Sequence, residues 1–412
     1  MNRRVVVTGL GAITPLGNDV ASYWDGLKNG RNGIGPITRF DASGLKAQLA
    51  AEVKDFNPKD YMEPKEVRQT DRYEQYALAA AQQALDDSGI SGKIEPDRLG
   101  VYFGSGIGGF ETFVNEHNNL LTRGPQRVSP FFITKMIANM AAGMIAIHAG
   151  ANGPCLDVTT ACATGTNAIG EAMRAIRHGY ADAMIAGGAD AVIHELAMSG
   201  FINCMALTES SDKDAASIPF DKRRNGFVMG EGAGALILEE YEHAKARGAK
   251  IYAEIAGYGS TCDAFHVTAP DGEAKASAKA IADALAETGL DCPAGEIYIN
   301  AHGTSTPLND KTETLAIKKA FGEEKARALH VSSTKSMTGH LLGAAGAIEA
   351  IAAVKALEQN LVPPTINYKE ADPECDLDIT PNNAVETPLS MALSTSLGFG
   401  GHNACIAFIK AE

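Results

Sequence analysis

The chain has 412 residues, of which 45% are hydrophobic, and a formal net charge of −14 at pH 7. This length exceeds what one compact core usually holds, so two halves of similar size are expected. The acidic balance argues against nucleic acid or an anionic membrane as the main partner, because both carry charge of the same sign. No uninterrupted apolar run reaches membrane-spanning length, which predicts no membrane insertion.

The seven cysteines are widely scattered and form no Cys-x-x-Cys pair. This spacing supports neither a disulfide framework nor a structural zinc site. The run from Met1 passes directly into strand-like residues without the apolar region of a signal peptide. Together these features predict a soluble protein in the reducing cytoplasm.

Strand-like and helical patterns alternate along the first part of the chain. A valine run at 5–7 ends in Gly9-Leu-Gly11, which predicts a strand closed by a glycine turn, and 131–148 predicts one apolar helix. Further buried strands are predicted to begin at Val101, Val158 and Ala183 and after the glycine-rich bend that follows Phe227, with helices over 19–29, 73–88 and from Cys162 to about 178.

A polar helix over 240–250 ends at a glycine and places the boundary between two halves, 1–250 and 251–412. The second half repeats the alternation. Its predicted strands lie near 252–258, 297–300, 329–333, 391–396 and 404–409, with helices near 273–288, 310–320 and 343–359. This alternation is typical of layered α/β sheets.

Cys162 occupies an unusual setting. The β-branched residues Val158-Thr-Thr160 precede it, small residues surround it, and a helical pattern follows. The pattern predicts a strand, a tight turn and a helix whose N-terminus faces the sulfur. Such a position lowers the pKa of a thiol and favours the nucleophilic thiolate. The alternative is a buried, inert cysteine.

Two histidines follow predicted strands and precede small residues. His302 begins the run His-Gly-Thr-Ser-Thr306, and His340 ends the run Lys335-Ser-Met-Thr-Gly-His. Histidines at strand ends are candidates for a functional site. One cysteine with two such histidines indicates acyl transfer through a thioester.

Four motifs in this order make the chain resemble the β-ketoacyl-[acyl-carrier-protein] synthase family, and within it the bacterial elongating enzymes of type II. The resemblance spans the whole chain. The motifs are Thr160-Ala-Cys162-Ala-Thr-Gly165, Asn300-Ala-His302-Gly-Thr-Ser-Thr306, Lys335-Ser-Met-Thr-Gly-His340 and Gly398-Phe-Gly-Gly-His-Asn403, and Ile107 in Gly-Ser-Gly-Ile-Gly-Gly matches the type II enzymes.

The resemblance implies a thiolase-like α/β fold of two related αβ halves in five layers, αβαβα, and a homodimer. It implies that Cys162 carries the acyl chain as a thioester, and that His302 and His340 stabilise the enolate formed when malonyl-acyl carrier protein loses CO₂. The product would be 3-oxoacyl-acyl carrier protein, in fatty acid elongation. The backbone N–H groups of Cys162 and Phe399 would form the oxyanion hole.

Further roles come from the same resemblance. Lys335 and Glu349 would form a buried charged pair that supports His340. Thr304 and Thr306 would hold the pantetheine arm. Because Ile107 lies on a glycine-rich loop and Phe399 in a Gly-Phe-Gly-Gly segment, we predict that Ile107 lines the acyl tunnel and that Phe399 gates it. No redox cofactor or catalytic metal is implied. The family holds a monovalent cation whose ligands match Asn300, Glu349 and Ser394, but Thr395 stands where the family has an asparagine.

The partner implied by the resemblance is acyl carrier protein, which is strongly acidic. Since this chain is also acidic, docking requires a local positive patch. Lys65 and Arg68 lie in a segment similar to the family's docking segment, although Gln69 replaces a frequent lysine.

Other readings fit less well. Thiolases use a second cysteine as base, and type III synthases have a Cys-His-Asn set. The non-catalytic chain-length subunits of polyketide systems lack the nucleophile that Cys162 supplies. A polyketide ketosynthase stays open as an alternative.

Overall fold

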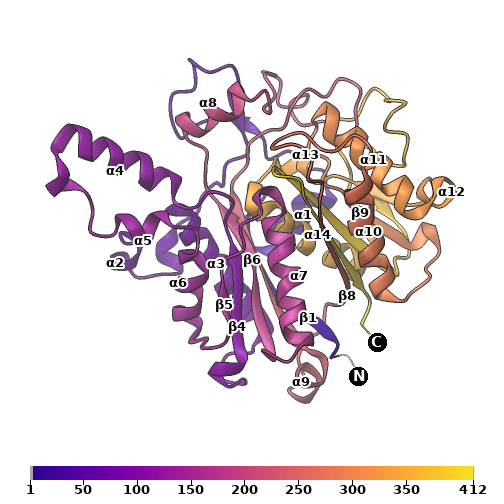
Figure 1. The fold of residues 1–412 in the computed structure, drawn as a ribbon, viewed down its shortest axis with the longest axis horizontal. Helices are drawn as coiled ribbons and strands as arrows, with labels where there is room; N and C mark the ends of the chain where they lie inside the picture. Colours follow the sequence, from indigo (N-terminus) through magenta and orange to yellow (C-terminus); the bar gives the residue numbers. More distant parts are fainter. Residues whose placement is uncertain (1–2, 412) are drawn as a thin grey trace.

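The computed structural model describes residues 3–411, and a ten-stranded mixed sheet runs through the molecule (Figure 1). From one edge to the other its strands are β10 (His330–Ser332), β9 (Ile297–Asn300), β13 (Met391–Gly398), β14 (His402–Ile409), β8 (Ala253–Cys262), β1 (Val5–Ile13), β7 (Gly232–Glu240), β6 (Ala183–Asp190), β4 (Leu99–Gly104) and β5 (Cys155–Leu156). Short pairs β2 (Gly35–Pro36) with β3 (Leu49–Ala50) and β11 (Leu361–Val362) with β12 (Val385–Glu386) lie outside it.

The strand order is the same in the two halves of the chain. In each half the second strand in sequence is parallel to the third and the fourth, while the fifth is antiparallel to the fourth and the first. The halves meet where β1 and β8 pair over two positions, Val6 with Glu254 and Val7 with Ala253. This internal repeat confirms the prediction of two related αβ units. The predicted division at 250/251 falls in the connection before β8 and stays a prediction as a domain boundary.

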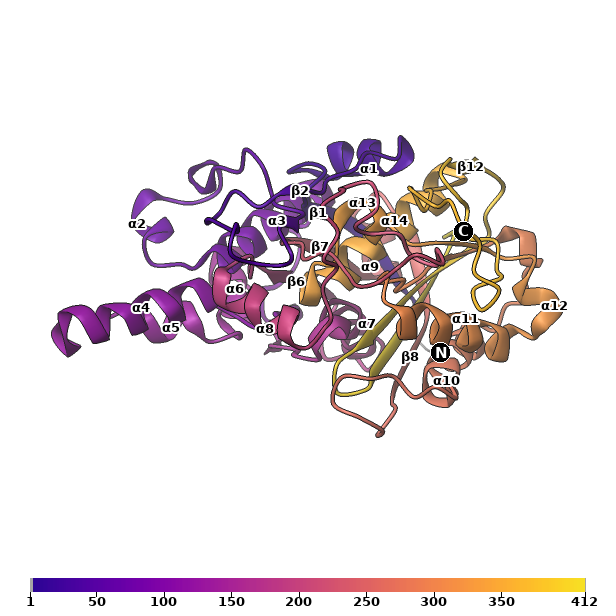
Figure 2. The same ribbon diagram turned by 90° about the horizontal axis from the view of Figure 1, so that it is seen from above.

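Helices form three layers around the two parts of the sheet (Figures 1 and 2). The middle layer contains α7 (Thr164–Arg177) and α14 (Ala345–Gln359). One outer layer, with α3 (Arg72–Ser88) and α6 (Met140–Ala149), covers the N-terminal strands, and α10 (Lys275–Thr288) with α11 (Pro307–Phe321) covers the C-terminal strands. The predicted five-layer αβαβα arrangement is therefore confirmed.

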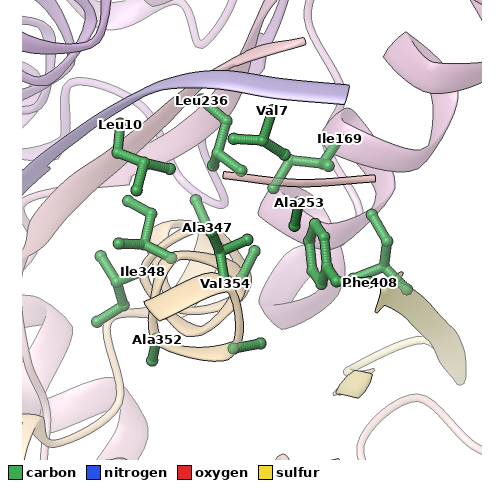
Figure 3. Close-up of a cluster of buried hydrophobic side chains, with 14 of the residues drawn as sticks. Val7, Leu10, Ile169, Leu236, Ala253, Ala347, Ile348, Ala352, Val354 and Phe408 are labelled. Atoms are coloured by element: carbon green, nitrogen blue, oxygen red, sulfur yellow. The ribbon is translucent and has the colours of Figure 1, made fainter. Parts of the chain in front are cut away.

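The core lies between the strands and the middle helices. Figure 3 shows Val7 and Leu236 from the N-terminal strands packed against Ile169 of α7 and Val354 of α14, with Phe408 on the C-terminal side. Helix α14 is rich in alanine and buried on all sides, as a central helix requires. Burying this apolar surface provides the main driving force for folding.

The remaining helices are short or peripheral. They are α1 (Val20–Lys28), α2 (Pro64–Val67), α4 (Phe110–Arg123), α5 (Phe132–Met136), α8 (Glu195–Asn203), α9 (Tyr241–Ala246), α12 (Glu323–Ala326) and α13 (Lys335–Thr338). Helix α4 extends away from the body of the molecule in Figures 1 and 2. Among residues 3–411, no helix combines the length and hydropathy needed to cross a membrane.

Two predicted elements differ in the structure. The first strand does not end at a glycine turn but continues to Ile13. Its glycines instead permit close contact with α3, because a Cβ on Gly9 would lie 2.2 Å from the Ala84 carbonyl oxygen, and one on Gly11 would lie 1.9 Å from that of Ala80. Residues 158–160 pair with no strand of the described chain, since β5 already ends at Leu156.

The predicted helix over 131–148 is two helices, α5 and α6, separated by an extended residue, Ile137. External donors take the carbonyl groups at the break. The Tyr73 hydroxyl donates to the Ile137 carbonyl at 2.7 Å, and the Gly109 N–H donates to the Met136 carbonyl at 3.0 Å. The hydrophobic pattern alone carries no sign of these tertiary contacts.

Candidate active site

A cavity of about 540 Å³ opens between the two halves of the chain. Predicted site residues from separate loops line it, and the structure brings them together: Ile107, Cys162, His302, Thr304, Thr306, His340 and Phe399. These residues follow the ends of strands or precede helices in both repeats. The cavity therefore depends on the packing of the two halves against each other.

Cys162 lies in a 3-10 turn, Ala161–Ala163, directly before α7. Ala161 has a positive φ of 50°, so the chain reverses sharply just before the nucleophile candidate. Gly398 passes close to this turn, because a Cβ there would lie 2.8 Å from the Thr160 carbonyl oxygen and 3.2 Å from the Cys162 nitrogen. The next residue, Phe399, directs its backbone N–H towards the sulfur. The Phe399 N–H thus faces the sulfur, and the Cys162 backbone lies beside the same strand end.

The electrostatic prediction for this thiol is wrong in direction. Burial raises the pKa of the Cys162 thiol to about 12, while the Lys335 ammonium and the Phe399 N–H act to lower it. Removal from water outweighs the helix N-terminus on which the sequence argument relied. The resting group is therefore a protonated thiol, which must lose its proton as it attacks.

His340 is buried at 2% exposure and stands edge-to-face with His302, with ring centroids 5.2 Å apart. Its Nδ1 accepts a hydrogen bond from the Leu342 N–H at 3.3 Å. Burial and the charge of Lys335 hold its pKa well below the usual value, so the ring is neutral. A neutral ring that accepts at Nδ1 carries its proton on Nε2, which has no partner within residues 3–411.

His302 presents the same tautomer by a different route. Its Nδ1 faces the Lys335 ammonium at 3.4 Å, and an ammonium can only donate. Burial, Lys335 and His340 together hold the pKa of His302 well below its usual value. Both imidazoles are thus neutral and carry the proton on Nε2. Each ring can therefore donate a hydrogen bond from Nε2 without adding positive charge.

Lys335 and Glu349 form the predicted ion pair, and each side chain is 1% exposed. The charge of Lys335 also lowers the pKa of His340, the ring that this pair was expected to support. Lys335 lies against Nδ1 of His302, because α13 begins at the end of β10, the strand that pairs in parallel with β9. Burial raises the pKa of Glu349 to about 7, although Lys335 opposes this shift.

Glu313 is a site residue that the sequence argument missed. It is fully buried on α11 and accepts hydrogen bonds from the backbone N–H groups of His302 and Gly303, both at 2.7 Å, and from the Thr395 hydroxyl at 2.7 Å. These bonds fix the loop that carries His302. The missed signal is spacing, because Asp310, Glu313 and Ile317 recur on one face of the helix and all three are buried.

The predicted ligands of a monovalent cation carry buried oxygen atoms without partners among residues 3–411, namely Asn300 Oδ1, Ser394 Oγ and Glu349 Oε2. Asn300 and Ser394 are register partners on neighbouring strands. Oxygen donors of this kind fit a hard cation. The Thr395 hydroxyl already donates a hydrogen bond to Glu313, so it is not a fourth oxygen without a partner. No group of three or more His, Cys, Asp or Glu suited to a metal occurs within 3–411.

Lys65 and Arg68 are exposed on and directly after α2 and do not line the cavity. Within the described chain neither makes an ion pair, so both charges are available to a partner. The Thr304 and Thr306 hydroxyls lie 2.9 Å apart at the cavity wall. The sequence thus identified residues of two separate surfaces, one inside the cavity and one outside it.

Comparison with known proteins identifies the class of protein that this fold and site define. The family described as "Beta-ketoacyl synthase, N-terminal domain" matches residues 2–244, and "Beta-ketoacyl synthase, C-terminal domain" matches 252–369. The chain belongs to the β-ketoacyl synthase family.

Individual relatives cover the full length. The chain is 54% identical over 412 residues to the 3-oxoacyl-[acyl-carrier-protein] synthase 2 of Synechocystis sp., covering 100% of this chain and 99% of the relative. Its identity to the synthase 2 of Staphylococcus aureus is 51% with the same coverage. Among solved structures, the ishigamide ketosynthase/chain length factor gives a TM-score of 0.92 at 39% identity, and a β-ketoacyl synthase from Burkholderia phymatum gives 0.90 at 35%, each covering 100% of both chains.

The contact of Lys335 with the site leads to a test of its charge. Because Lys335 lowers the pKa of Cys162, Lys335→Met should raise that pKa and slow alkylation of Cys162 by iodoacetamide at pH 8. Each unit of increase reduces the thiolate fraction about tenfold. The rate is measured by mass spectrometry of the peptide that contains Cys162. The variant should also lose about 3–5 kcal/mol of stability, because Glu349 remains buried without its partner.

Lys355→Met is the matched control, since Lys355 lies on α14 and pairs with Glu358 at the protein surface. It should alkylate at the rate of the unmodified chain. Faster alkylation of Cys162 in Lys335→Met would contradict the assigned electrostatics.

Proposed function

We propose that this protein catalyses the decarboxylative Claisen condensation of acyl-acyl carrier protein with malonyl-acyl carrier protein, giving 3-oxoacyl-acyl carrier protein, CO₂ and free carrier protein. The reaction is the chain-elongation step of fatty acid synthesis. The observation that carries this proposal is the placement of two neutral Nε2–H donors, His302 and His340, in one cavity with Cys162. The names of the relatives at 54% and 51% identity support it.

In the first half-reaction the Cys162 sulfur attacks the thioester carbonyl of the acyl carrier. The S–H bond of Cys162 breaks, and its proton goes to the departing pantetheine sulfur. The tetrahedral oxyanion accepts hydrogen bonds from the N–H groups of Cys162 and Phe399. Loss of one such donor typically costs about a hundredfold in rate or more.

In the second half-reaction the pantetheine arm of malonyl-acyl carrier protein enters the position that the first carrier's arm has left. The bond to the carboxylate carbon breaks, CO₂ leaves, and the electron pair forms an enolate. Its oxygen accepts hydrogen bonds from Nε2–H of His302 and of His340. The enolate carbon then attacks the acyl-Cys162 carbonyl and releases the Cys162 thiolate, which takes up a proton from solvent water.

Other residues determine what enters the cavity. Ile107 is 38% exposed on the cavity wall, where it limits the length of the acyl chain, and Phe399 follows Gly398 and precedes two glycines with positive φ that allow it to swing. The Thr304 and Thr306 hydroxyls hold the amides of the pantetheine arm. If a monovalent cation binds, Asn300, Ser394 and Glu349 hold it and it supplies only charge compensation beside Lys335.

Separate variants should divide the two half-reactions. Cys162→Ala removes the acyl acceptor but keeps both histidines, so condensation should disappear while CO₂ release from malonyl-acyl carrier protein continues. His302→Ala or His340→Ala should lower CO₂ release by about a hundredfold, because a donor to the enolate is lost. Release of labelled CO₂ and product mass measure the two steps. Condensation by Cys162→Ala would show that another residue is the nucleophile.

A polyketide ketosynthase is the second candidate, favoured by the structural neighbours. One of these, with a TM-score of 0.90 and 37% identity, is a type II polyketide ketosynthase in complex with its acyl carrier protein. The products separate the two functions. Repeated addition to an unreduced 3-oxo chain would favour polyketide synthesis, whereas a single addition to a saturated chain would favour fatty acid elongation.

Lys65 and Arg68 form the proposed docking patch for the acidic carrier protein. Lys65→Glu with Arg68→Glu should raise the KM for acyl-acyl carrier protein about tenfold or more at low salt, since charges at an interface rim mainly control association. Turnover of small acyl-pantetheine thioesters should stay unchanged, because neither residue lines the cavity.

Lys93→Glu with Lys410→Glu changes the net charge equally at distant exposed positions and serves as the control. An equal loss of activity with carrier-bound and small substrates would assign Lys65 and Arg68 a structural role instead.

A homodimer is proposed from an apolar face at the edge of the sheet. Within residues 3–411 strand β5 pairs only with β4, and Leu156 on it is 54% exposed. Ile147 on α6, Leu121 on α4 and Ile133 on α5 add further exposed apolar side chains at 72%, 70% and 55%. A second copy could continue the sheet across β5 and cover this face.

The free state of all seven cysteines agrees with the proposed cytoplasmic location.

The apolar face gives a test of assembly. Ile147→Lys with Leu156→Lys should convert the dimer to a monomer in sedimentation experiments, because each lysine would be buried without a partner. Leu290→Lys, at an exposed apolar residue of the C-terminal half, should leave the dimer intact. A dimer that persists in the double variant would place the interface elsewhere.

A further inference from the structure

Asp190 is a buried carboxylate that the proposed reaction does not use. It ends strand β6 and has no exposed surface. Within residues 3–411 no ion pair to it is formed. Burial raises the pKa of Asp190 to about 6, even though several donors act to lower it, so the group is ionised at neutral pH.

Four donors from two segments hold this carboxylate. From the loop after β4, the Ser105 hydroxyl donates to Oδ1 at 2.6 Å, the Ile107 N–H donates to Oδ1 at 3.3 Å, and the Gly106 N–H donates to Oδ2 at 2.9 Å. From the turn after His340, the Gly343 N–H donates to Oδ2 at 2.6 Å. One oxygen, Oδ2, therefore joins a loop of the N-terminal half to a turn of the C-terminal half.

The two segments pass so closely that only glycine fits at the crossing. A Cβ on Gly343 would lie 2.5 Å from the Gly106 nitrogen and 2.7 Å from Asp190 Oδ2. A Cβ on Gly106 would lie 2.9 Å from the same oxygen. The position of each segment is thus fixed against the other through the carboxylate.

Each segment carries a site residue. Ile107 is on the loop and lines the cavity. Leu342, next to Gly343, donates its N–H to Nδ1 of His340 and so fixes the tautomer that presents Nε2–H. Asp190 is therefore bonded directly to the backbone of Ile107 on one side, and on the other it is bonded to Gly343, three residues after His340.

We infer that Asp190 is a positioning residue that couples the acyl-chain loop 105–107 to His340, so that one carboxylate determines both primer selectivity and decarboxylation. The inference rests on the proposed function for the identity of the two half-reactions. Asparagine at this position would keep the shape but exchange one acceptor oxygen for a donor NH₂. In one orientation of the asparagine amide, the NH₂ group would face the N–H groups of Gly106 and Gly343. In the other orientation it would face the N–H of Ile107.

The test uses the purified full-length chain and compares Asp190→Asn with the unmodified chain. The kcat for CO₂ release from malonyl-acyl carrier protein should fall about tenfold to a hundredfold, because small displacements of reacting groups have effects of this size. The KM should change less than about threefold, since the malonyl arm binds elsewhere. Transfer of a palmitoleoyl primer should fall more than transfer of a hexanoyl primer, because only the longer chain needs the Ile107 wall.

Ser105→Ala separates the two sides, because it removes a donor on the loop and leaves the Gly343 bond in place. It should lower palmitoleoyl transfer roughly threefold or more, the effect of one lost hydrogen bond, without changing CO₂ release. If Asp190→Asn does not fold, this variant decides, and an unchanged ratio of the two primers overturns the inference.

Asp221→Asn is the control, since Asp221 is another fully buried carboxylate that accepts backbone N–H groups, those of Lys369 and Glu370, away from the cavity. Asp221→Asn should change neither the ratio of palmitoleoyl to hexanoyl transfer nor the kcat and KM of CO₂ release. Wild-type kinetics in Asp190→Asn overturn the coupling alone. Absence of condensation by the unmodified chain would instead overturn the proposed function.

Discussion

The close contact between α7 and α14 positions the whole site. A Cβ on Gly346 would lie 2.1 Å from the Thr166 hydroxyl, and one on Gly165 would lie 2.6 Å from the Ala347 nitrogen, so the two helices touch with backbone against backbone. Each helix follows the third strand of its half, with Cys162 just before α7 and His340 just before α14. The internal repeat therefore places the nucleophile and one enolate donor at equivalent points of two related units. Duplication of a fold thus yields a site between its copies.

The buried charged groups around this contact shift the pKa values of the site residues and hold its loops in place. Lys335 lowers the pKa of Cys162, His302 and His340 together, and Glu349 keeps that ammonium within the core. Two other buried carboxylates, Glu313 and Asp190, are held mainly by backbone N–H groups and hydroxyls, and each fixes a loop. Such networks contribute less to stability than apolar packing of the same volume would, but they define one geometry.

The amino-acid pattern was sufficient for most strands and for Cys162, His302 and His340, because strand ends followed by small residues mark where loops converge. The five layers and the roles of Thr304, Thr306 and Phe399 came from the resemblance to the family. The pattern failed where tertiary contacts override local signals. The predicted helix over 131–148 breaks because Tyr73 and Gly109 donate to its carbonyl groups, and residues 158–160 have no strand partner among residues 3–411. The sign of the Cys162 pKa shift and the contact of Lys335 with His302 depend on burial and distance in three dimensions, which no spacing in the sequence encodes.

The tautomers of the histidines constrain how the first proton moves. Since Nδ1 of His340 accepts from Leu342 and Nδ1 of His302 faces Lys335, both lone pairs are occupied and both Nε2 atoms carry hydrogen. Neither ring then offers a free base to Cys162, whose thiol is protonated at neutral pH. The exchange needs no such base in its overall proton balance, because one thiol is consumed and one is released, and the proton that Cys162 loses leaves on the departing pantetheine thiol. The thiol exchange therefore balances without either ring as a base, and the same two rings stay ready as donors for the enolate.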